Sequence, residues 1–277
     1  MMVSFYRPNI KRNKILIEAD AFPSDIYAVN SQISHHGYEP KDTLIKLSSR
    51  EGESVVRTED IEQVIREKGD EISLIMLGGV NYYTGQVFDF ETITKLAHDK
   101  GILVGFDLAH AAGNIKLELH KWNVDFAVWC SYKYLNSGPG SLAGAFIHEK
   151  HHKSSLPRFA GWWGHNKENR FKMPDEFEPI QTAEGWQQSN PPILSLAAIR
   201  ASLSIFDEIG MDALVTKSKK MTDYLIWLLK TIKTNKVNII TPKEKGCQIS
   251  IQVKNADKKI FKIITKKGVI ADWREPD

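Results

Sequence analysis

The feature that most constrains this chain is the alternation of short apolar runs with amphipathic stretches of helical period. Runs rich in aliphatic and β-branched residues fall at 14–20, 43–49, 73–80, 102–110, 125–135 and 141–150. Helical stretches separate several of them, as at 57–69 and 89–101. Strands that alternate with helices of this length indicate crossover connections, and therefore a mostly parallel sheet covered by helices.

The stretch 57–69 illustrates the helical pattern. Ile61, Val64 and Ile65 recur at the spacing of one helix face and predict its buried side. Thr58 is expected to cap the first turn, and Gly69 to end the helix.

The last third of the chain has a different character. Residues 191–210 and 211–232 predict two consecutive helices, and short apolar runs with a helical stretch then predict the start of a small α+β domain. We therefore expect a large domain at 1–195 and an incomplete small domain with its linking helix at 196–277. Residues 1–8 read as the end of a helix, and no apolar element follows Ile270, so we expect a chain that is incomplete at both ends.

Composition excludes several classes of protein. Apolar residues are 42% and charged residues 26%, as in a globular protein with a real core. No apolar run approaches the roughly 18 residues of a membrane span. From Met211 onward 15 Lys and Arg face 7 Asp and Glu. We interpret this basic tail as a solvated helix face; a nucleic-acid binder is the alternative, and its affinity would depend steeply on salt.

Two cysteines, Cys130 and Cys247, are too few for a disulfide framework or a zinc cluster. Their apolar neighbours predict buried, reduced thiols in a cytoplasmic protein.

Polar side chains with reactive chemistry follow two of the predicted strands. Asp107 and His110 end one run, and Tyr132 and Lys133 follow the next. Ligands bind beyond the carboxyl ends of parallel strands. A lysine in a desolvated pocket is a nucleophile toward an aldehyde, as pyridoxal phosphate requires, and that cofactor also needs a carboxylate at its ring nitrogen. Lys133 and Asp107 are the candidates, and the small Ala109 can lie under a flat ring.

Two other motifs are weaker evidence of a functional site. His148, Glu149 and His152 have zinc-protease spacing, but no amphipathic helix surrounds them, so we regard the match as chance. The glycines at 138 and 140 do not fit a dinucleotide fingerprint and predict a tight turn.

The strings FDLAHAAGN, CSYKYLN, GWWGH and SNPP together resemble the kynureninase family, and the resemblance extends over nearly the whole chain. It implies an α/β PLP-dependent transferase-like fold of type I, with a three-layer α/β/α large domain and a mostly parallel sheet. It also implies pyridoxal 5′-phosphate, a cytoplasmic homodimer with shared sites, and no nucleic-acid or membrane partner. The implied reaction, a step of tryptophan catabolism, is hydrolysis of L-kynurenine or 3-hydroxy-L-kynurenine to anthranilate or 3-hydroxyanthranilate and L-alanine.

The resemblance also implies roles for individual residues. Lys133 would bind the cofactor covalently, Asp107 would pair with its ring nitrogen, and Tyr132 would bind its phosphate and act as an acid or base. Arg274 matches an arginine that precedes the family's substrate-carboxylate clamp, so it is not assigned that role. The further cofactor-binding candidates are Phe22, Ser24, Asp25, Gly78, His110, Trp162 and Asn190.

Alternatives remain open for several of these residues. Phe22 could be a core residue, Ser24 an N-cap, and Trp162 a packing residue beside Trp163. The family often has serine where Gly78 stands, so only a backbone contact is expected there. For the whole chain, the alternatives are another fold type I enzyme (a desulfurase or aminotransferase) or a weakly active fragment with only a scaffold or dimerisation role.

Overall fold

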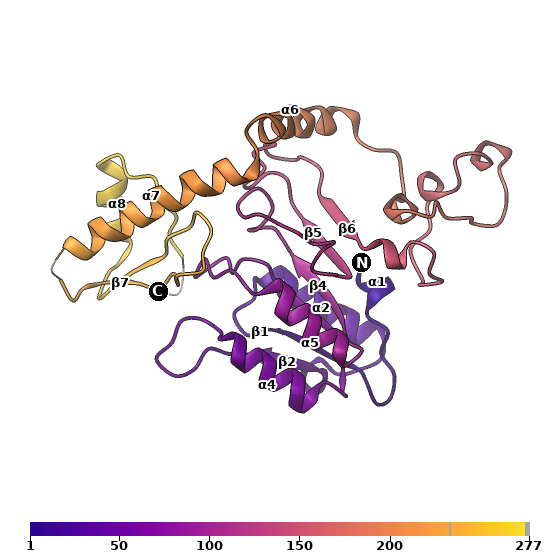
Figure 1. Cartoon of the computed structure of the whole chain (residues 1–277), viewed down its shortest axis with the longest axis horizontal. Helices are drawn as coiled ribbons and strands as arrows, with labels where there is room; N and C mark the ends of the chain where they lie inside the picture. Colours follow the sequence, from indigo (N-terminus) through magenta and orange to yellow (C-terminus); the bar gives the residue numbers. More distant parts are fainter. Residues whose placement is uncertain (233, 275–277) are drawn as a thin grey trace.

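The computed structural model describes residues 1–232 and 234–274 (Figure 1). Its main feature is a six-stranded sheet in the order β2-β1-β3-β4-β5-β6. The strands β1 to β5 are parallel, and β6 is antiparallel to β5 at the edge. Their bounds are β1 Lys14–Glu18, β2 Leu44–Leu47, β3 Ile72–Gly78, β4 Leu103–Asp107, β5 Phe126–Trp129 and β6 Gly144–Ile147.

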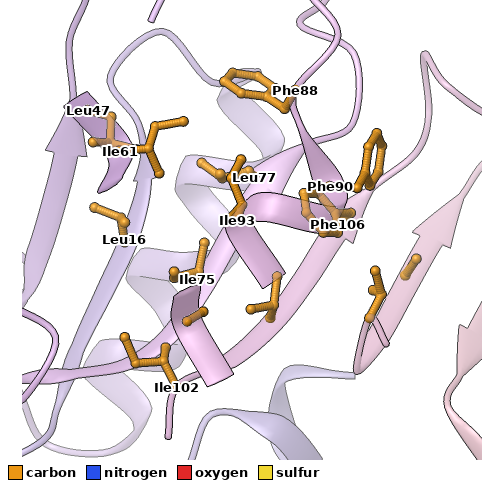
Figure 2. Close-up of a cluster of buried hydrophobic side chains, with 14 of the residues drawn as sticks. Leu16, Leu47, Ile61, Ile75, Leu77, Phe88, Phe90, Ile93, Ile102 and Phe106 are labelled. Atoms are coloured by element: carbon orange, nitrogen blue, oxygen red, sulfur yellow. The ribbon is translucent and has the colours of Figure 1, made fainter. Parts of the chain in front are cut away.

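Helices cover both faces of this sheet, which confirms the three-layer expectation. On one face α4 (Thr58–Lys68) and α5 (Phe90–Asp99) bury Ile61 and Ile93 against Ile75 and Leu77 of β3 (Figure 2). Buried residues of α1 (Met2–Phe5) and α2 (Pro23–His35) belong to a second apolar cluster, which includes Leu74 and Met76 of β3. Neighbouring residues of β3 thus enter different clusters, because successive side chains of a strand point to opposite faces.

The helix ends differ in part from the prediction. α4 begins at Thr58, so Arg57 occupies the N-cap position and the predicted Thr58 cap is wrong. The Arg57 side chain does not cap the helix and instead pairs with Glu53. In α5 the Asp89 side chain does cap the helix, since it accepts a hydrogen bond from Thr92 N at 3.0 Å.

The rest of the chain extends away from the sheet. Between 149 and 186 it forms short 3₁₀ turns, and then α6 (Ile193–Ile209) and α7 (Met211–Thr231) follow (Figure 1). β7 (Val237–Ile239) and β8 (Ile251–Val253) form a two-stranded antiparallel sheet beside α8 (Lys258–Lys266). The short turns and the remaining helix are α3 Pro40–Thr43, η1 Glu149–His151, η2 Trp162–Gly164, η3 Arg170–Lys172 and η4 Ala183–Trp186.

Neither cysteine is buried, which corrects the sequence-based expectation. Both are free. Cys130 is only half-buried because it directly follows β5, at the carboxyl end of that strand. Cys247 is exposed in the connection between β7 and β8. In the described ranges we find no helix with the length and apolar character that a membrane crossing requires.

Candidate active site

A cavity of about 300 Å³ opens at the carboxyl edge of the parallel strands. Its walls come from the ends of β1, β3, β4 and β5 and from the first turn of α2. All the predicted site residues except Trp162 and Asn190 line it, namely Phe22, Ser24, Asp25, Gly78, Asp107, His110, Tyr132 and Lys133. The prediction that this edge gathers the reactive residues is therefore confirmed.

The backbone holds Asp107 firmly at the end of β4. Asp107 pairs in register with Gly78 of β3 on one side and Val128 of β5 on the other. Its Oδ1 accepts a hydrogen bond from Ala109 N at 2.7 Å. This carboxyl group is therefore positioned before any ligand enters.

Lys133 lies in the turn that follows β5 and reaches into the same cavity. Its Nζ lies 5.8 Å from the centroid of the Phe22 ring. Phe22 is 43% exposed at the rim, so the alternative of a core residue is wrong. The N-cap alternative for Ser24 is also wrong, because Phe22 holds that position and Ser24 lies inside α2.

Acidic groups crowd the floor of the cavity. Burial, together with the nearby Asp107 to which it is hydrogen-bonded, raises the pKa of Asp25 to about 7. Burial likewise raises the pKa of Glu18 to about 7, against hydrogen bonds from Asn81 and Gly78 that favour its ionised form. In both acids burial therefore disfavours the charged form.

His110 is a neutral imidazole on the wall of this cavity. Burial, with the nearby cations Lys133 and Arg274, lowers its pKa to about 4. Within the described structure its buried Nδ1 has no hydrogen-bond partner. An unpaired buried nitrogen beside a cavity marks a place for a polar ligand group.

The Tyr132 side chain is 52% exposed at the rim, and the neighbouring Cys130 thiol, which is hydrogen-bonded to it, raises its pKa. Tyr132 is therefore a protonated donor at neutral pH.

These residues fit pyridoxal phosphate. The group needs a flat slot, an amine at its aldehyde and a carboxylate at its ring nitrogen. The cavity offers Lys133 and Asp107 as the charged groups, and the Phe22 ring and the small Ala109 among its walls. The orphaned Nδ1 of His110 supplies an unused hydrogen-bonding site on the same wall.

Trp162 and Asn190 lie apart from this cavity. Trp162 Nε1 donates to Arg170 O at 3.4 Å, and the Trp162 ring lies edge-on to Phe171. Asn190 is exposed in the segment before α6. Their predicted contact with the cofactor phosphate stays a prediction.

The cavity residues that sequence reasoning missed include Glu18, Asn81 and Tyr82. A signal did exist for Glu18, because an acid at the end of the apolar run KILIE needs buried partners. No comparable local signal marks Asn81 and Tyr82, which lie in the turn after β3.

The zinc-protease spacing has a different structural setting. Glu149 lies in the short 3₁₀ turn η1, between His148 and His152. Across residues 1–232 and 234–274 there is no group of three or more His, Cys, Asp or Glu that could hold a metal ion.

Comparisons with known proteins agree with this fold and site. The profile of the aminotransferase class-V family matches residues 16–271. A mutant of the cystine C-S lyase C-DES, with glycine covalently linked to its PLP cofactor, has a TM-score of 0.75 at 15% identity, over 96% of this chain and 68% of that one. The cysteine desulfurase CsdA of Escherichia coli has a TM-score of 0.74 at 14% identity, over 97% and 64%. The fold and the cavity define a pyridoxal-phosphate-dependent enzyme of the class-V aminotransferase type.

Curated relatives narrow this class further. Kynureninase of Flavobacterium psychrophilum is 55% identical over all of this chain and 67% of its own length. Kynureninase of Myxococcus xanthus is 54% identical, and that of Mus musculus is 49% identical over 62% of its length. The chain belongs to the kynureninase family and spans about two thirds of the length of these relatives.

Proposed function

We propose that this chain cleaves the Cβ–Cγ bond of L-kynurenine or 3-hydroxy-L-kynurenine with water, yielding L-alanine and the corresponding anthranilate. The observation that carries the proposal is the convergence of Lys133, Asp107 and Phe22 on one cavity, in a chain 55% identical to a kynureninase. This reaction belongs to tryptophan catabolism and leads toward NAD biosynthesis.

Lys133 and Asp107 have complementary tasks in this reaction. When bound, pyridoxal phosphate supplies an electron sink for the bonds at the substrate α-carbon. Lys133 Nζ would hold the cofactor at its aldehyde group and would move the proton at the substrate Cα. The Asp107 carboxylate would hold a proton on the ring nitrogen, which would keep the ring electron-poor.

The remaining side chains of the cavity would orient and hold the cofactor. Phe22 would pack on the ring, Ser24 and Asp25 would hold the cofactor from the first turn of α2, and Gly78 would offer backbone contact only. Tyr132 would donate a hydrogen bond to the phosphate, and neutral His110 would line the cofactor site without adding charge.

The direct test is an assay of the 277-residue chain with pyridoxal phosphate and L-kynurenine, followed by the fluorescence of anthranilate. We expect the product with wild type, and neither product nor bound-cofactor absorbance near the visible edge with Lys133→Ala. A panel with cysteine and other amino acids serves as the control for reaction type. Release of sulfide from cysteine without cleavage of kynurenine would assign the chain to a desulfurase instead.

We further propose that the chain forms a homodimer in which each copy contributes Trp162 and Asn190 to the phosphate site of the other. Both residues lie outside the cavity of their own chain, which supports sharing. Large apolar side chains are exposed nearby and on α6 and α7, such as Phe171, Leu194 and Trp227. Burial of this apolar surface between two copies would stabilise their association.

Two further proposals concern the place and organisation of the protein. We assign it to the cytoplasm, supported by two free thiols at Cys130 and Cys247. We also propose residues 1–195 as the cofactor-binding domain and 196–277 as a linking helix with a small α+β domain. The separate β7-β8 sheet supports this division.

A further inference from the structure

Glu18 is an ionisable residue of the cavity lining to which the reaction assigns no task. It is the last residue of β1 and only 3% exposed. Its Oε1 accepts a hydrogen bond from Gly78 N at 2.7 Å, and its Oε2 accepts one from Asn81 Nδ2 at 2.7 Å. No ion pair with Lys, Arg or His is found for this carboxylate in the described part of the chain, so these two donors are what offset its burial.

The first of these donors belongs to the strand beside Asp107. Gly78 ends β3 and pairs in register with Asp107, whose carbonyl oxygen accepts a hydrogen bond from Gly79 N at 2.8 Å. A Cβ at position 78 would lie 3.0 Å from Glu18 Oε1, so the carboxylate packs directly against this strand end. Displacement of Glu18 would therefore move the backbone that fixes Asp107.

The second donor belongs to the turn that closes the cavity wall. Asn81 Oδ1 accepts hydrogen bonds from Tyr83 N at 3.0 Å, Thr84 N at 2.9 Å and Thr84 Oγ1 at 3.1 Å. Between these residues lies Tyr82, whose ring is edge-on to Phe22 at 5.2 Å between centroids. Glu18 thus orders the Tyr82 side of the cavity through one amide group.

We propose that Glu18 is a positioning residue, whose two hydrogen bonds lock the end of β3 and the Tyr82 turn into the shape that accepts the cofactor. This inference rests on the proposed function only for the identity of the cofactor. It assigns a task to a residue that makes no direct contribution to bond cleavage.

The geometry provides a pair of substitutions that test it. In Glu18→Gln one oxygen becomes an NH₂ group, which must face either Gly78 N–H or the Asn81 NH₂. The Asn81 amide cannot turn over to accept it, because its oxygen already accepts three hydrogen bonds. One hydrogen bond is therefore lost in either orientation. Asn81→Asp also loses one hydrogen bond, because it removes the donor to Glu18 and places two carboxyl groups face to face.

The double variant Glu18→Gln with Asn81→Asp restores every pairing. The new glutamine side chain can accept from Gly78 N–H and donate to the new carboxylate at position 81, whose other oxygen keeps its three donors. We expect the Kd of pyridoxal phosphate, measured by absorbance titration, to rise at least about tenfold in each single variant. In the double variant we expect it to return to within about threefold of wild type.

A second measurement needs no cofactor. Hydrogen exchange of the cofactor-free protein is expected to speed up at least about tenfold for amides in 78–84 in Glu18→Gln and to recover in the double variant. Asp125→Asn is the matched control, since Asp125 is a buried carboxylate at the opposite end of the strands. It should loosen residues near Val104 and leave the Kd of pyridoxal phosphate within about twofold.

Unchanged cofactor affinity in Glu18→Gln, or a double variant no better than the single ones, would overturn the proposal. These outcomes are separate from failure of the proposed function. A wild-type chain that binds pyridoxal phosphate but does not cleave kynurenine would reject the reaction and leave the task of Glu18 intact.

Discussion

Asp107 is the residue whose chemistry can be tested most directly. Strand pairing fixes its backbone on both sides, so removal of its side chain should change the charge at the cofactor ring while the end of β4 stays in place. We expect Asp107→Ala to lower kcat for kynurenine about 10³-fold, in the range for loss of a preorganised electrostatic group. Steady-state kinetics with saturating cofactor measure this loss.

The control for that substitution is Asp70→Ala, because the Asp70 side chain is 86% exposed and does not line the cavity. It should keep full activity. Activity of Asp107→Ala within about tenfold of wild type would show that another group protonates the ring.

Asp25 gives the cofactor-free protein a dependence of stability on pH. Its pKa of about 7, raised by burial and by Asp107, lies above the 3.8 of an ordinary aspartate, so the folded state holds its proton more tightly than the unfolded state. This contribution is complete below about pH 4 and is lost as pH rises through about 7. We expect the free energy of unfolding to fall less between pH 5 and pH 8 in Asp25→Asn than in wild type.

Urea unfolding at several pH values measures this difference. The exposed Asp42→Asn serves as the control and should keep the wild-type slope. Identical slopes for Asp25→Asn and wild type would mean that Asp25 does not hold a proton against Asp107.

Individual site residues could be predicted from the sequence where they follow a strand of the parallel sheet. Asp107 and Lys133 follow apolar runs, and the ends of parallel strands meet at one edge, so their shared cavity was predictable. Glu18 was missed because its partners are Gly78 and Asn81, about 60 residues away in sequence. Pairing across that distance leaves no periodic trace in the sequence.

At the scale of elements, one buried carboxylate joins a strand, a helix and a turn. Asp125 accepts hydrogen bonds from Val104 N of β4 at 2.7 Å, His98 Nε2 of α5 at 2.8 Å and His151 Nε2 of η1 at 2.7 Å. Lys150 Nζ lies 2.8 Å from the same carboxylate. Burial disfavours its charge, but these donors outweigh burial and hold the pKa of Asp125 below its usual range.

We therefore expect Asp125→Asn to lower the free energy of unfolding by about 3 kcal/mol at pH 7, the usual loss when a buried charged network is broken. A lowered pKa gives stability that is present above the ordinary aspartate pKa and is lost as pH falls. The difference between variant and wild type should accordingly shrink toward pH 3 in chemical unfolding. A difference that stays constant with pH would exclude the ionic explanation, and the exposed pair of Glu149 with His120 offers Glu149→Gln as a neutral control.

The elements themselves were largely predictable because their patterns are local. The stripe of Ile61 and Ile65 and the run 73–80 gave the right helix and strand. The cap of α4 was not predictable from Thr58 alone, since Arg57 takes the cap position and its side chain pairs with Glu53. Local propensity is a weak guide wherever side chains have competing partners.

At the scale of the whole molecule, the three layers could be predicted from the alternation of strands and helices. The contacts of the last third of the chain with the large domain could not be predicted in this way. The connection between β7 and β8 lies against the Tyr82 turn, where Gln248 Nε2 donates to Tyr82 O at 2.9 Å. Cys247 N also donates to Asn114 Oδ1 at 2.8 Å. Such contacts join segments more than 130 residues apart, and only the folded chain reveals them.

The proposed sharing of sites between two copies makes a prediction about mixed dimers. A Lys133→Ala copy keeps Trp162, and a Trp162→Ala copy keeps Lys133. If each copy lends Trp162 to the other, a mixed dimer contains one site with both residues intact and one site with neither. Random exchange of equal amounts makes half of the dimers mixed, so the mixture should regain about a quarter of the wild-type activity.

The mixture is prepared by unfolding and refolding the two variants together, and its activity is measured at limiting pyridoxal phosphate, where loss of a phosphate contact has most effect. Each variant refolded alone is the control and should remain near its own low activity. If Trp162 instead serves the cavity of its own chain, no site in the mixed dimer is intact and no activity returns. Light scattering that finds dimers without any recovery of activity would therefore reject shared sites, and a monomer would reject the dimer itself.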